Sequence, residues 1–354
     1  MARLGFYKYI SFMLLVFTLL VSVFTLFGLF GGSANPVHET AMAMIVYILP
    51  ILLTCNVATL IFWLIRRRWH WASIPAVTLA CCIPYIGTTF QTGLFTPGDE
   101  GKEHINIATY NVALFGKELM GFKAEDILSE MKRQEVGILC FQEYKQFSGN
   151  KDNTEKYVKH FGHMAKGRED MVIFSSYPIK AHSIIDFGPN TNNSAMWADI
   201  LVKGQTYRVF NAHLQTTGFN RVLHHAAKEE MAGHKLEENA IIRAIYDNYT
   251  LGMVNRAIQA DLVAKEIAQS PHPVILCGDF NDVPYSYVYN LMKGELVDGF
   301  KECGQGWMYT MRGKKRVRID YIFHDKSLTG ISYKREDLSY SDHYPVFMTV
   351  VRSN

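Results

Sequence analysis

Val274-Ile275-Leu276-Cys277-Gly278-Asp279-Phe280-Asn281 is an apolar run that ends in a glycine, a carboxylate and an amide. A short apolar run with β-branched residues predicts a buried strand. Residues two apart on a strand point to the same face, so Asp279 and Asn281 should project together. Asp-Phe-Asn alone is also common in turns, so this stretch indicates a functional site only together with similar fragments elsewhere in the sequence.

Polar side chains also follow or interrupt other apolar runs of the sequence. Each of these fragments is a weak signal taken singly, because acidic and imidazole side chains often end solvated strands. Six fragments in one order, all at expected strand ends, indicate a common site. They are Tyr110-Asn111-Val112, Gln142-Glu143, Asn211-Ala212-His213-Leu214-Gln215, Gly278-Asp279-Phe280-Asn281, Arg318-Ile319-Asp320-Tyr321 and Ser341-Asp342-His343.

Strands greatly outnumber helices in the expected order of elements after residue 103, and the helices lie between strands. This order predicts an α/β fold of the α+β kind, with a sheet-on-sheet core and outer helices. Helical periodicity appears at Ala124–Arg133, Glu237–Tyr249 and Val254–Gln269. The predicted strands are Ile105–Val112, Val136–Glu143, Met171–Ser175, Met196–Val202, Tyr207–Leu214, Val274–Asp279, Val317–Phe323 and Tyr344–Val351.

The ordered set of fragments resembles the endonuclease/exonuclease/phosphatase superfamily, which includes deoxyribonucleases, sphingomyelinases and inositol-polyphosphate phosphatases. The resemblance covers about residues 103–352, and Ser175-Ser176-Tyr177-Pro178 also matches a recurrent structural strand of the group. It implies a four-layer αββα sandwich as the catalytic domain, with the site at one end of the two packed sheets.

The resemblance also implies a metal site. Glu143 would be the principal ligand, with Asn111 beside it and Asp342 close by. Hard oxygen ligands suit Mg²⁺, which accepts one or two carboxylates and keeps several waters, and Mn²⁺ is the alternative. A cation of this kind lowers the barrier for a nucleophile that approaches a negatively charged phosphodiester.

Catalytic roles follow from the same resemblance. Asp279 would position or deprotonate the attacking water, and Asn281 would hold that water or the phosphoryl oxygens. His343 would be oriented by Asp320, because an Asp–His pair fixes the imidazole tautomer. His213 would donate to the phosphate or assist the leaving group. Two further residues, Asn211 and Arg318, are assigned to substrate binding.

Three uncharged stretches precede the catalytic region, at about residues 9–30, 41–65 and 71–93. Each is long enough to cross a hydrocarbon core of about 30 Å as a helix. A cleaved signal peptide is the alternative for the first stretch, and prolines make the third the weakest candidate. We therefore expect a membrane anchor of three transmembrane helices over 1–96, a linker over 97–102 and the catalytic domain over 103–354.

Basic residues beside these stretches predict their orientation. Arg3 and Lys8 precede the first stretch, three arginines at 66–68 follow the second, and the intervening loop 31–40 has no Lys or Arg. Positive charge is retained on the cytoplasmic side. The N-terminus is therefore expected in the cytoplasm and the catalytic domain on the periplasmic or extracytoplasmic side.

The charge of the catalytic region bears on its substrate. Of the 36 Lys and Arg residues only five precede residue 97, and of the 33 acidic residues only Glu39 does, so the remainder has 31 basic and 32 acidic residues. A net charge of −1 disfavours a general nucleic-acid binder. We expect a phosphoesterase acting beside a lipid bilayer on a lipid head group or small phosphodiester. The alternatives are a membrane-tethered nuclease for DNA or RNA and a non-catalytic binding module.

Several segments keep two interpretations. The basic run 312–318 is either a solvated hairpin or a contact for phosphate or anionic lipid. The aromatic residues Trp307 and Tyr309 either flank a substrate groove or pack against each other. Residues 218–255 are hypothesised to form a lid. The six cysteines suggest buried thiols rather than a disulfide or zinc framework. Two interpretations also remain for a group of histidines and glutamates, which form either a solvated face or a second metal site: His224, His225, His234, Glu229 and Glu230.

Overall fold

The chain forms two compact units, each with its own internal contacts. One consists of Met1–Thr88 and Pro284–Asn290, and the other of Thr89–Val283 and Leu291–Asn354. The computed structural model describes residues 2–94, 103–113, 124–144, 154–168, 170–189, 191–217, 226, 228–231, 237–313 and 316–353. The expected linker 97–102 and His224, His225, His234, Lys314 and Lys315 lie outside the described residues.

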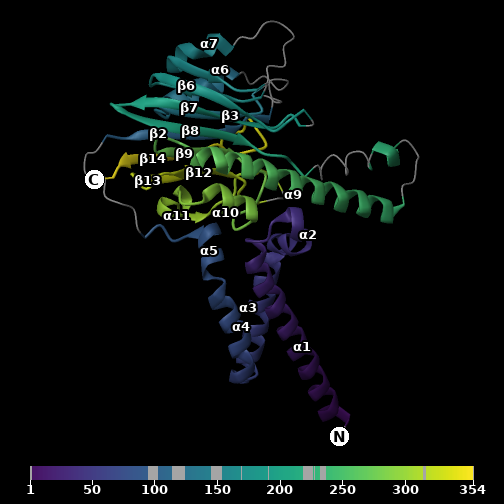
Figure 1. Ribbon diagram of the computed structural model, residues 1–354. Helices are drawn as coiled ribbons and strands as arrows, with labels where there is room; N and C mark the ends of the chain where they lie inside the picture. The colour runs from purple at the N-terminus through teal and green to yellow at the C-terminus, as the bar shows by residue number, and fades with distance from the viewer. Residues whose placement is uncertain are drawn as a thin grey trace. The chain divides into compact units, whose positions relative to one another are not determined.

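The first unit is built from apolar helices (Figure 1). Tyr7–Gly31 and Pro36–Ile65 are each long and apolar enough to cross a membrane, and the next two helices qualify only as a pair bent by 50°. Pro84 has no N–H for a helical hydrogen bond, which explains the break before it. Two helices, or three if the bent pair counts as one, are therefore long and apolar enough to cross a membrane. The helices are α1 (Ala2–Gly31), α2 (Pro36–Ile45), a 3₁₀ turn (Val46–Ile48), α3 (Leu49–Ile65), α4 (Trp69–Cys81) and α5 (Ile83–Thr89).

Several polar side chains are buried inside this unit, and many large apolar side chains are exposed on its surface. Ser22 Oγ donates to Asn56 Oδ1 at 3.0 Å, and Asn56 Nδ2 donates to Thr25 Oγ1 at 2.7 Å. Trp63 Nε1 donates to Thr18 Oγ1 at 3.0 Å, so α1 and α3 share a polar seam. In lipid, such hydrogen bonds hold helices together while apolar residues face the acyl chains. The exposed residues include Phe12, Leu19, Leu20, Phe24, Phe27, Ile51, Val57 and Ile61.

Two six-stranded sheets form the second unit. The first sheet has the order β10-β12-β9-β8-β7-β6, and the second has the order β13-β14-β2-β3-β5-β4. The first consists of β10 (Val297–Asp298), β12 (Asp320–His324), β9 (Val274–Asp279), β8 (Gln205–His213), β7 (Ser194–Val202) and β6 (Ile179–Asp186). The second consists of β13 (Leu328–Arg335), β14 (Val346–Arg352), β2 (Ile105–Asn111), β3 (Ile138–Gln142), β5 (Val172–Ser175) and β4 (His163–Lys166). A separate pair joins β1 (Phe90–Gln91) to β11 (Gly306–Trp307).

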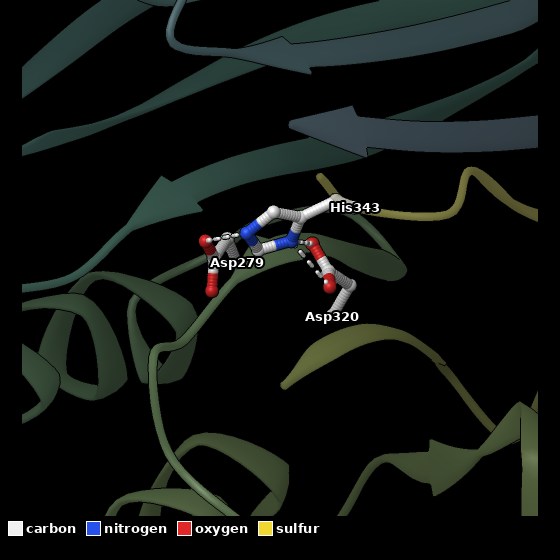
Figure 2. Close-up of side chains that lie close together, drawn as sticks. All are labelled: Asp279, Asp320 and His343. Atoms are coloured by element: carbon white, nitrogen blue, oxygen red, sulfur yellow. Dashed lines mark hydrogen bonds and ion pairs between the residues drawn. The ribbon is translucent and has the colours of Figure 1, made fainter. Parts of the chain in front are cut away.

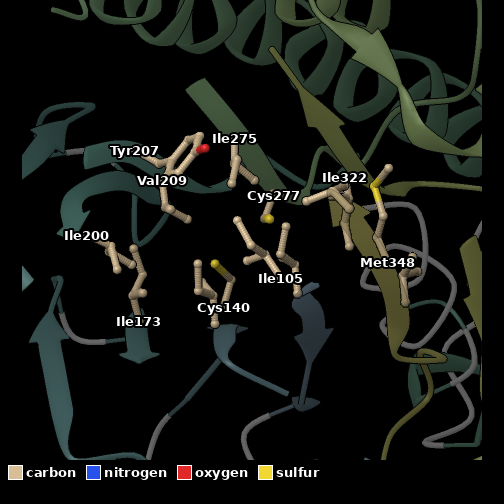
Figure 3. Packing of buried hydrophobic residues seen from close by; sticks show 14 of the residues in the cluster. Ile105, Cys140, Ile173, Ile200, Tyr207, Val209, Ile275, Cys277, Ile322 and Met348 are labelled. Atoms are coloured by element: carbon tan, nitrogen blue, oxygen red, sulfur yellow. The ribbon is translucent and has the colours of Figure 1, made fainter. Parts of the chain in front are cut away.

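The two sheets are stacked and covered by helices. Their facing side chains make one core, in which Cys140 and Ile173 of the second sheet lie opposite Val209, Ile275 and Cys277 of the first (Figure 3). The outer helices α6 (Ala124–Arg133) and α7 (Thr154–Phe161) lie on one side of the stack, and α9 (Glu238–Ala268) and α11 (Gly299–Cys303) on the other (Figure 1). This is the expected α/β sandwich. The short helix α10 (Tyr287–Lys293) includes residues of both units.

Each of the eight predicted strands overlaps an observed strand, and the helix Ala124–Arg133 is observed with the predicted bounds. The two helices predicted at 237–249 and 254–269 were wrong as separate elements, because they form one continuous helix, α9. Gly252 lies between them, and a Cβ there would approach the Thr217 Cα to 2.9 Å. The glycine therefore serves close packing and does not end the helix. The edge strands β4, β6 and β13 were not predicted.

Candidate active site

Strand pairing brings the predicted polar residues to one edge of the stack. In the first sheet β8 and β9 are parallel, and Asp279 pairs in register with His213 on one side and with Asp320 of β12 on the other. In the second sheet β2 and β3 are also parallel, so Asn111 lies beside Gln142. The carboxyl ends of neighbouring parallel strands necessarily meet at the same sheet edge, which explains the cluster.

The backbone around Asp279 requires specific residues. Gly278 has φ +143°, and a Cβ there would lie 1.9 Å from the Ala212 carbonyl oxygen, so only glycine lets β8 and β9 approach. Asn281 has φ +51°, and its N–H donates to Asp279 Oδ1 at 2.8 Å. Its side-chain Nδ2 donates to the Leu214 carbonyl at 2.9 Å. This turn fixes the Asp279 carboxylate and ties it to the end of β8.

His343 lies between two buried carboxylates (Figure 2). Its Nδ1 donates to Asp320 at 3.0 Å from Oδ2, and its Nε2 lies 3.8 Å from Asp279 Oδ2. Burial favours the neutral imidazole, but the negative charges of Asp320 and Asp279 outweigh burial and raise the pKa of His343 to about 10. Burial and the Asp320 charge also raise the pKa of Asp279, although His343, His213 and Asn111 partly offset them.

A second imidazole–carboxylate pair faces the first. His213 Nδ1 donates to Asp170 Oδ2 at 3.0 Å, while its Nε2 lies 3.7 Å from Glu143 Oε1. Burial opposes the charge on His213, but its hydrogen bond to Asp170 and the charges of Asp279, Asp170 and Glu143 raise its pKa above the ordinary value. The two imidazoles are therefore held as donors on either side of Asp279.

Asn111 connects carboxylates from both sheets. Its Nδ2 donates to Glu143 Oε1 at 3.1 Å and to Asp279 Oδ2 at 2.9 Å, and its Oδ1 accepts from the Ala113 N–H at 2.9 Å. Glu143 has φ +51°, a left-handed conformation that costs a side chain other than glycine about 1 kcal/mol. Its side chain is 33% exposed, so this carboxylate opens the cluster to solvent.

Asp342 lies at the rim of the cluster. Its side chain is exposed, and its carbonyl accepts from the Arg312 N–H at 2.7 Å. The neighbouring Ser341 Oγ donates to the Asn111 carbonyl at 2.7 Å, which ties the loop that carries His343 to the end of β2. The structure thus brings eight of the ten predicted site residues to this sheet edge or next to it, whereas the side chains of Asn211 and Arg318 lie in the core.

The two predicted substrate-binding residues have internal partners. Asn211 is fully buried, accepts from Gln142 Nε2 at 2.6 Å and donates to the Phe141 carbonyl at 2.9 Å, so it bridges the two sheets. Arg318 is buried and binds both carboxylate oxygens of Asp298, at 3.0 and 2.7 Å. These contacts account for both residues structurally, and their role toward a substrate stays a prediction.

The profile of the Endonuclease/Exonuclease/phosphatase family matches residues 108–343, about two thirds of the chain. The chain belongs to the endonuclease/exonuclease/phosphatase family. A separate profile, of a domain of unknown function (DUF8431), matches residues 11–89. No curated protein matches the chain in a sequence comparison.

Solved structures share the fold of this endonuclease/exonuclease/phosphatase domain. TDP2 from D. rerio, in complex with a single-strand DNA product, is 17% identical with a TM-score of 0.51, over 70% of this chain and 99% of its own. A family protein from Beutenbergia cavernae is 16% identical with a TM-score of 0.51, over 72% of each chain. One from Bacteroides vulgatus is 15% identical with a TM-score of 0.51, over 71% of this chain and all of its own.

The composition of this endonuclease/exonuclease/phosphatase site fits a divalent cation. Asp279, Asp320 and His343 offer ligand atoms within 4.8 Å of one another. Among the described residues, Glu143, Asp170, Asp279 and Asp320 face two imidazoles, so the carboxylates of this cluster outnumber the imidazoles that pair with them. A hard divalent ion with oxygen ligands would offset this excess of carboxylates. Of the predicted ligands, Asn111 and Glu143 lie within hydrogen-bonding distance of each other and Asp342 lies at the rim.

Asp170 and the residues beneath the site were missed in the sequence. Asp170 precedes β5, which runs antiparallel to β3, so the start of one strand lies beside the end of the other. A search for polar residues after strands therefore passes over it. Thr310 also had no sequence signal, and its Oγ1 accepts the Asp320 N–H at 3.1 Å. Gln259 of α9 accepts the Gln215 N–H through its Oε1 at 2.8 Å. This hydrogen bond fixes the loop segment that follows His213 at the end of β8.

The raised pKa of His343 has a consequence for stability. A folded-state pKa of about 10 against an ordinary 6.5 means that protonated His343 stabilises the fold below about pH 6.5 and that this contribution is lost as pH rises toward 10. We expect the melting temperature of chelator-treated protein to fall across this range, and to fall less steeply in His343→Gln. Melting curves at stepped pH measure the two slopes, and the exposed His182→Gln is the control. Equal slopes in wild type and His343→Gln would contradict the assignment.

Proposed function

We propose that this protein is a membrane-anchored, Mg²⁺-dependent phosphoesterase that hydrolyses a phosphodiester by in-line attack of water. The arrangement that carries the proposal is the pair of buried imidazole–carboxylate dyads, His343–Asp320 and His213–Asp170, on either side of Asp279. Two cationic donors with a carboxylate between them match the needs of a phosphoryl group that gains charge during attack. A non-catalytic module would not need so many buried ionisable groups.

Each residue of the cluster has a defined part in the reaction. Asp279, whose pKa is raised by burial and by Asp320, accepts a proton from the attacking water as its oxygen bonds to phosphorus. The bond from phosphorus to the leaving oxygen breaks, and His213 donates a proton to that oxygen. His343 keeps its proton and donates a hydrogen bond to a phosphoryl oxygen. Asn281 holds the water or the phosphoryl oxygens through its amide.

The metal would be held by Glu143 and Asn111, with Asp342 at the rim. Mg²⁺ would supply a Lewis acid for the phosphoryl oxygens, and Mn²⁺ has the same preference for oxygen ligands. Asn111 already bonds to Glu143 and Asp279, so the side chains that would hold the ion are oriented in advance by the second sheet. The exposed part of Glu143 gives the ion a route from solvent.

The membrane anchor is supported by the inverted polarity of α1 and α3, whose polar side chains are buried while apolar ones are exposed. Three spans with Arg3, Lys8 and the arginines at 66–68 on the cytoplasmic side would place the catalytic domain outside the cytoplasm. Two spans would place the catalytic domain in the cytoplasm. The side of the membrane therefore depends on whether the bent pair α4 and α5 crosses the bilayer as one span.

A lipid head group or small phosphodiester is the favoured substrate. The region after residue 96 has a net charge of −1, whereas general nucleic-acid binding requires many cations against the phosphate backbone. A tether in the bilayer also raises the local concentration of lipid around the site. Nucleic acid is the competing substrate.

Loss of single site residues should abolish most of the activity. We expect Asp279→Asn and His343→Gln each to lower kcat/KM for bis(p-nitrophenyl) phosphate by about 10²–10⁴-fold, because each removes a proton-transfer or charge-stabilising group. Glu143→Gln should also require much more Mg²⁺. The detergent-solubilised full chain is assayed, with the exposed Glu295→Gln as a control that keeps its activity. Full turnover in both Asp279→Asn and His343→Gln would refute the site.

Substrate class is settled by a panel assayed with Mg²⁺. We expect cleavage of sphingomyelin, phosphatidylinositol phosphates or bis(p-nitrophenyl) phosphate in preference to plasmid DNA or RNA, because the domain lacks bulk positive charge. Product release is quantified for each substrate at equal phosphodiester concentration. The inactive Asp279→Asn protein controls for contaminating hydrolases. Cleavage of DNA with no cleavage of lipid would reverse this order.

The side of the membrane is tested with reporters fused after Asn354. We expect alkaline phosphatase, which needs an oxidising compartment, to be active there and green fluorescent protein to be dark when exported by the general secretory route. Matched fusions after Arg68 should give the opposite pattern, because that position is expected in the cytoplasm. A fluorescent fusion at the end of the chain would instead support two spans.

A further inference from the structure

A cluster of arginines and tyrosines lies beside the proposed catalytic residues and has no part in the reaction described above. Tyr309 and Tyr344 pack edge to face, with ring centroids 5.8 Å apart. The guanidinium of Arg335 lies 4.0 Å from the Tyr309 ring and 4.3 Å from the Tyr344 ring. Arg312 lies 3.9 Å from Tyr344, and Arg316 lies 5.4 Å from Tyr309. These five residues are called the arginine–tyrosine cluster.

Positive charge in this cluster is only partly neutralised. Arg312 forms an ion pair with Asp337 at 2.6 Å and also donates to the Leu338 carbonyl. Arg316 and Arg335 have no carboxylate within ion-pair distance in the part of the chain that the structure describes. Arg316 is exposed and Arg335 is half-buried, so both guanidinium groups can reach solvent. Two cations with up to five N–H donors each therefore remain available to an anion.

The cluster is joined directly to the loop that carries His343. Met311 forms a β-bridge with His343, and the Tyr344 N–H donates to the Thr310 carbonyl at 2.7 Å. Arg335 is paired with Val346 of β14, which is paired in turn with Thr109 of β2. Two strand spacings, roughly 10 Å, separate the Arg335 backbone from that strand, whose last residue is Asn111. The Arg335 guanidinium lies over Tyr344, the residue that directly follows His343.

Stacking alone does not explain the two unpaired arginines. A cation over a half-buried aromatic ring gains little free energy, and like charges that stack on the same rings repel each other. The rings do, however, hold the guanidinium planes in place before any ligand binds. A planar, oriented guanidinium binds phosphate through two parallel hydrogen bonds, and little ordering entropy is then lost on binding.

We propose that Arg316 and Arg335 bind a second phosphate group of the substrate, one that is ester-linked a few bonds away from the phosphate being hydrolysed. This proposal rests on the proposed phosphoesterase function and narrows its substrate to molecules with at least two phosphates. The phosphate at the imidazole pairs is cleaved, while the phosphate at the arginine–tyrosine cluster fixes the substrate. Arg312 is a positioning residue, since its charge is bound by Asp337 and its side chain supports Tyr344.

A matched pair of chromogenic substrates tests this subsite. Propyl p-nitrophenyl phosphate has one phosphate, and its 3-phosphopropyl analogue has a second one at the far end of the same chain. We expect wild type to show a KM about tenfold lower for the analogue, at similar kcat. Arg316→Gln and Arg335→Gln should raise the KM for the analogue several-fold and leave the KM for the propyl ester unchanged. Arg335→Lys should fall between, because an ammonium lacks the planar fork.

Controls separate this subsite from general electrostatics and from misfolding. Lys326→Gln removes an exposed cation that pairs with Glu295 on another part of the domain and should change neither KM. Melting curves must show that the arginine variants fold. Equal KM values of wild type for the two substrates would overturn the proposal. The proposal would also be overturned if Arg316→Gln and Arg335→Gln raised the KM of both substrates alike. It would be overturned as well if these variants lost only binding to anionic vesicles.

Binding without turnover distinguishes failure of this proposal from failure of the proposed function. Calorimetry compares 1,3-propanediol bisphosphate with propyl phosphate on the Asp279→Asn protein, with and without Arg335→Gln. Tighter binding of the bisphosphate that Arg335→Gln abolishes would support the subsite even if neither ester were hydrolysed. Equal affinities would overturn the subsite even if both esters were hydrolysed. Oligonucleotide and phosphoinositide competitors then identify which natural class supplies the second phosphate.

Discussion

The buried amide of Asn111 holds Glu143 and Asp279 together although these carboxylates come from different sheets. Beneath it, the amides of Gln142 and Asn211 make a second bridge of the same kind at 2.6 Å. A buried amide that loses its partner is costly, so both bridges resist any shift of one sheet against the other. The distance between the two halves of the cluster is therefore set by the packing of the whole sandwich, including its apolar core.

Charge is balanced in this site by pairing each imidazole with its own carboxylate. Isolated buried carboxylates would take up protons to escape the cost of desolvation. Here His343 is shared between Asp320 and Asp279, and His213 between Asp170 and Glu143, so each imidazole stabilises more than one negative charge. Glu143, whose side chain is 33% exposed, is the carboxylate through which this set of residues meets solvent.

The architecture and the clustering of most of the named residues could be predicted from the sequence because the motifs end strands, whereas the roles of these residues stay predictions. Asn111, His213 and Asp279 could be grouped without coordinates, since the ends of β2, β3, β8 and β9 have to meet at one edge. Asp170 could not, because it begins an antiparallel strand. Arg318 illustrates a different limit, since its position beside Asp320 gave no sign that Asp298 would bind it internally. Cation–aromatic stacking among Arg335, Tyr309 and Tyr344 depends on side-chain packing across separate strands, which local patterns do not contain.

The polar seam between α1 and α3 has a consequence for how the chain is made. Its described hydrogen bonds join residues between Thr18 and Trp63, so the seam uses no residue that follows α3 in the chain. Water cannot compete for these groups in lipid. In the proposed membrane-anchored protein, the helical hairpin can therefore assemble during insertion, before any strand of the sandwich has been synthesised. The sandwich would then fold with that attachment in place, and its long-range strand pairing would take place on a chain that is fixed at one end.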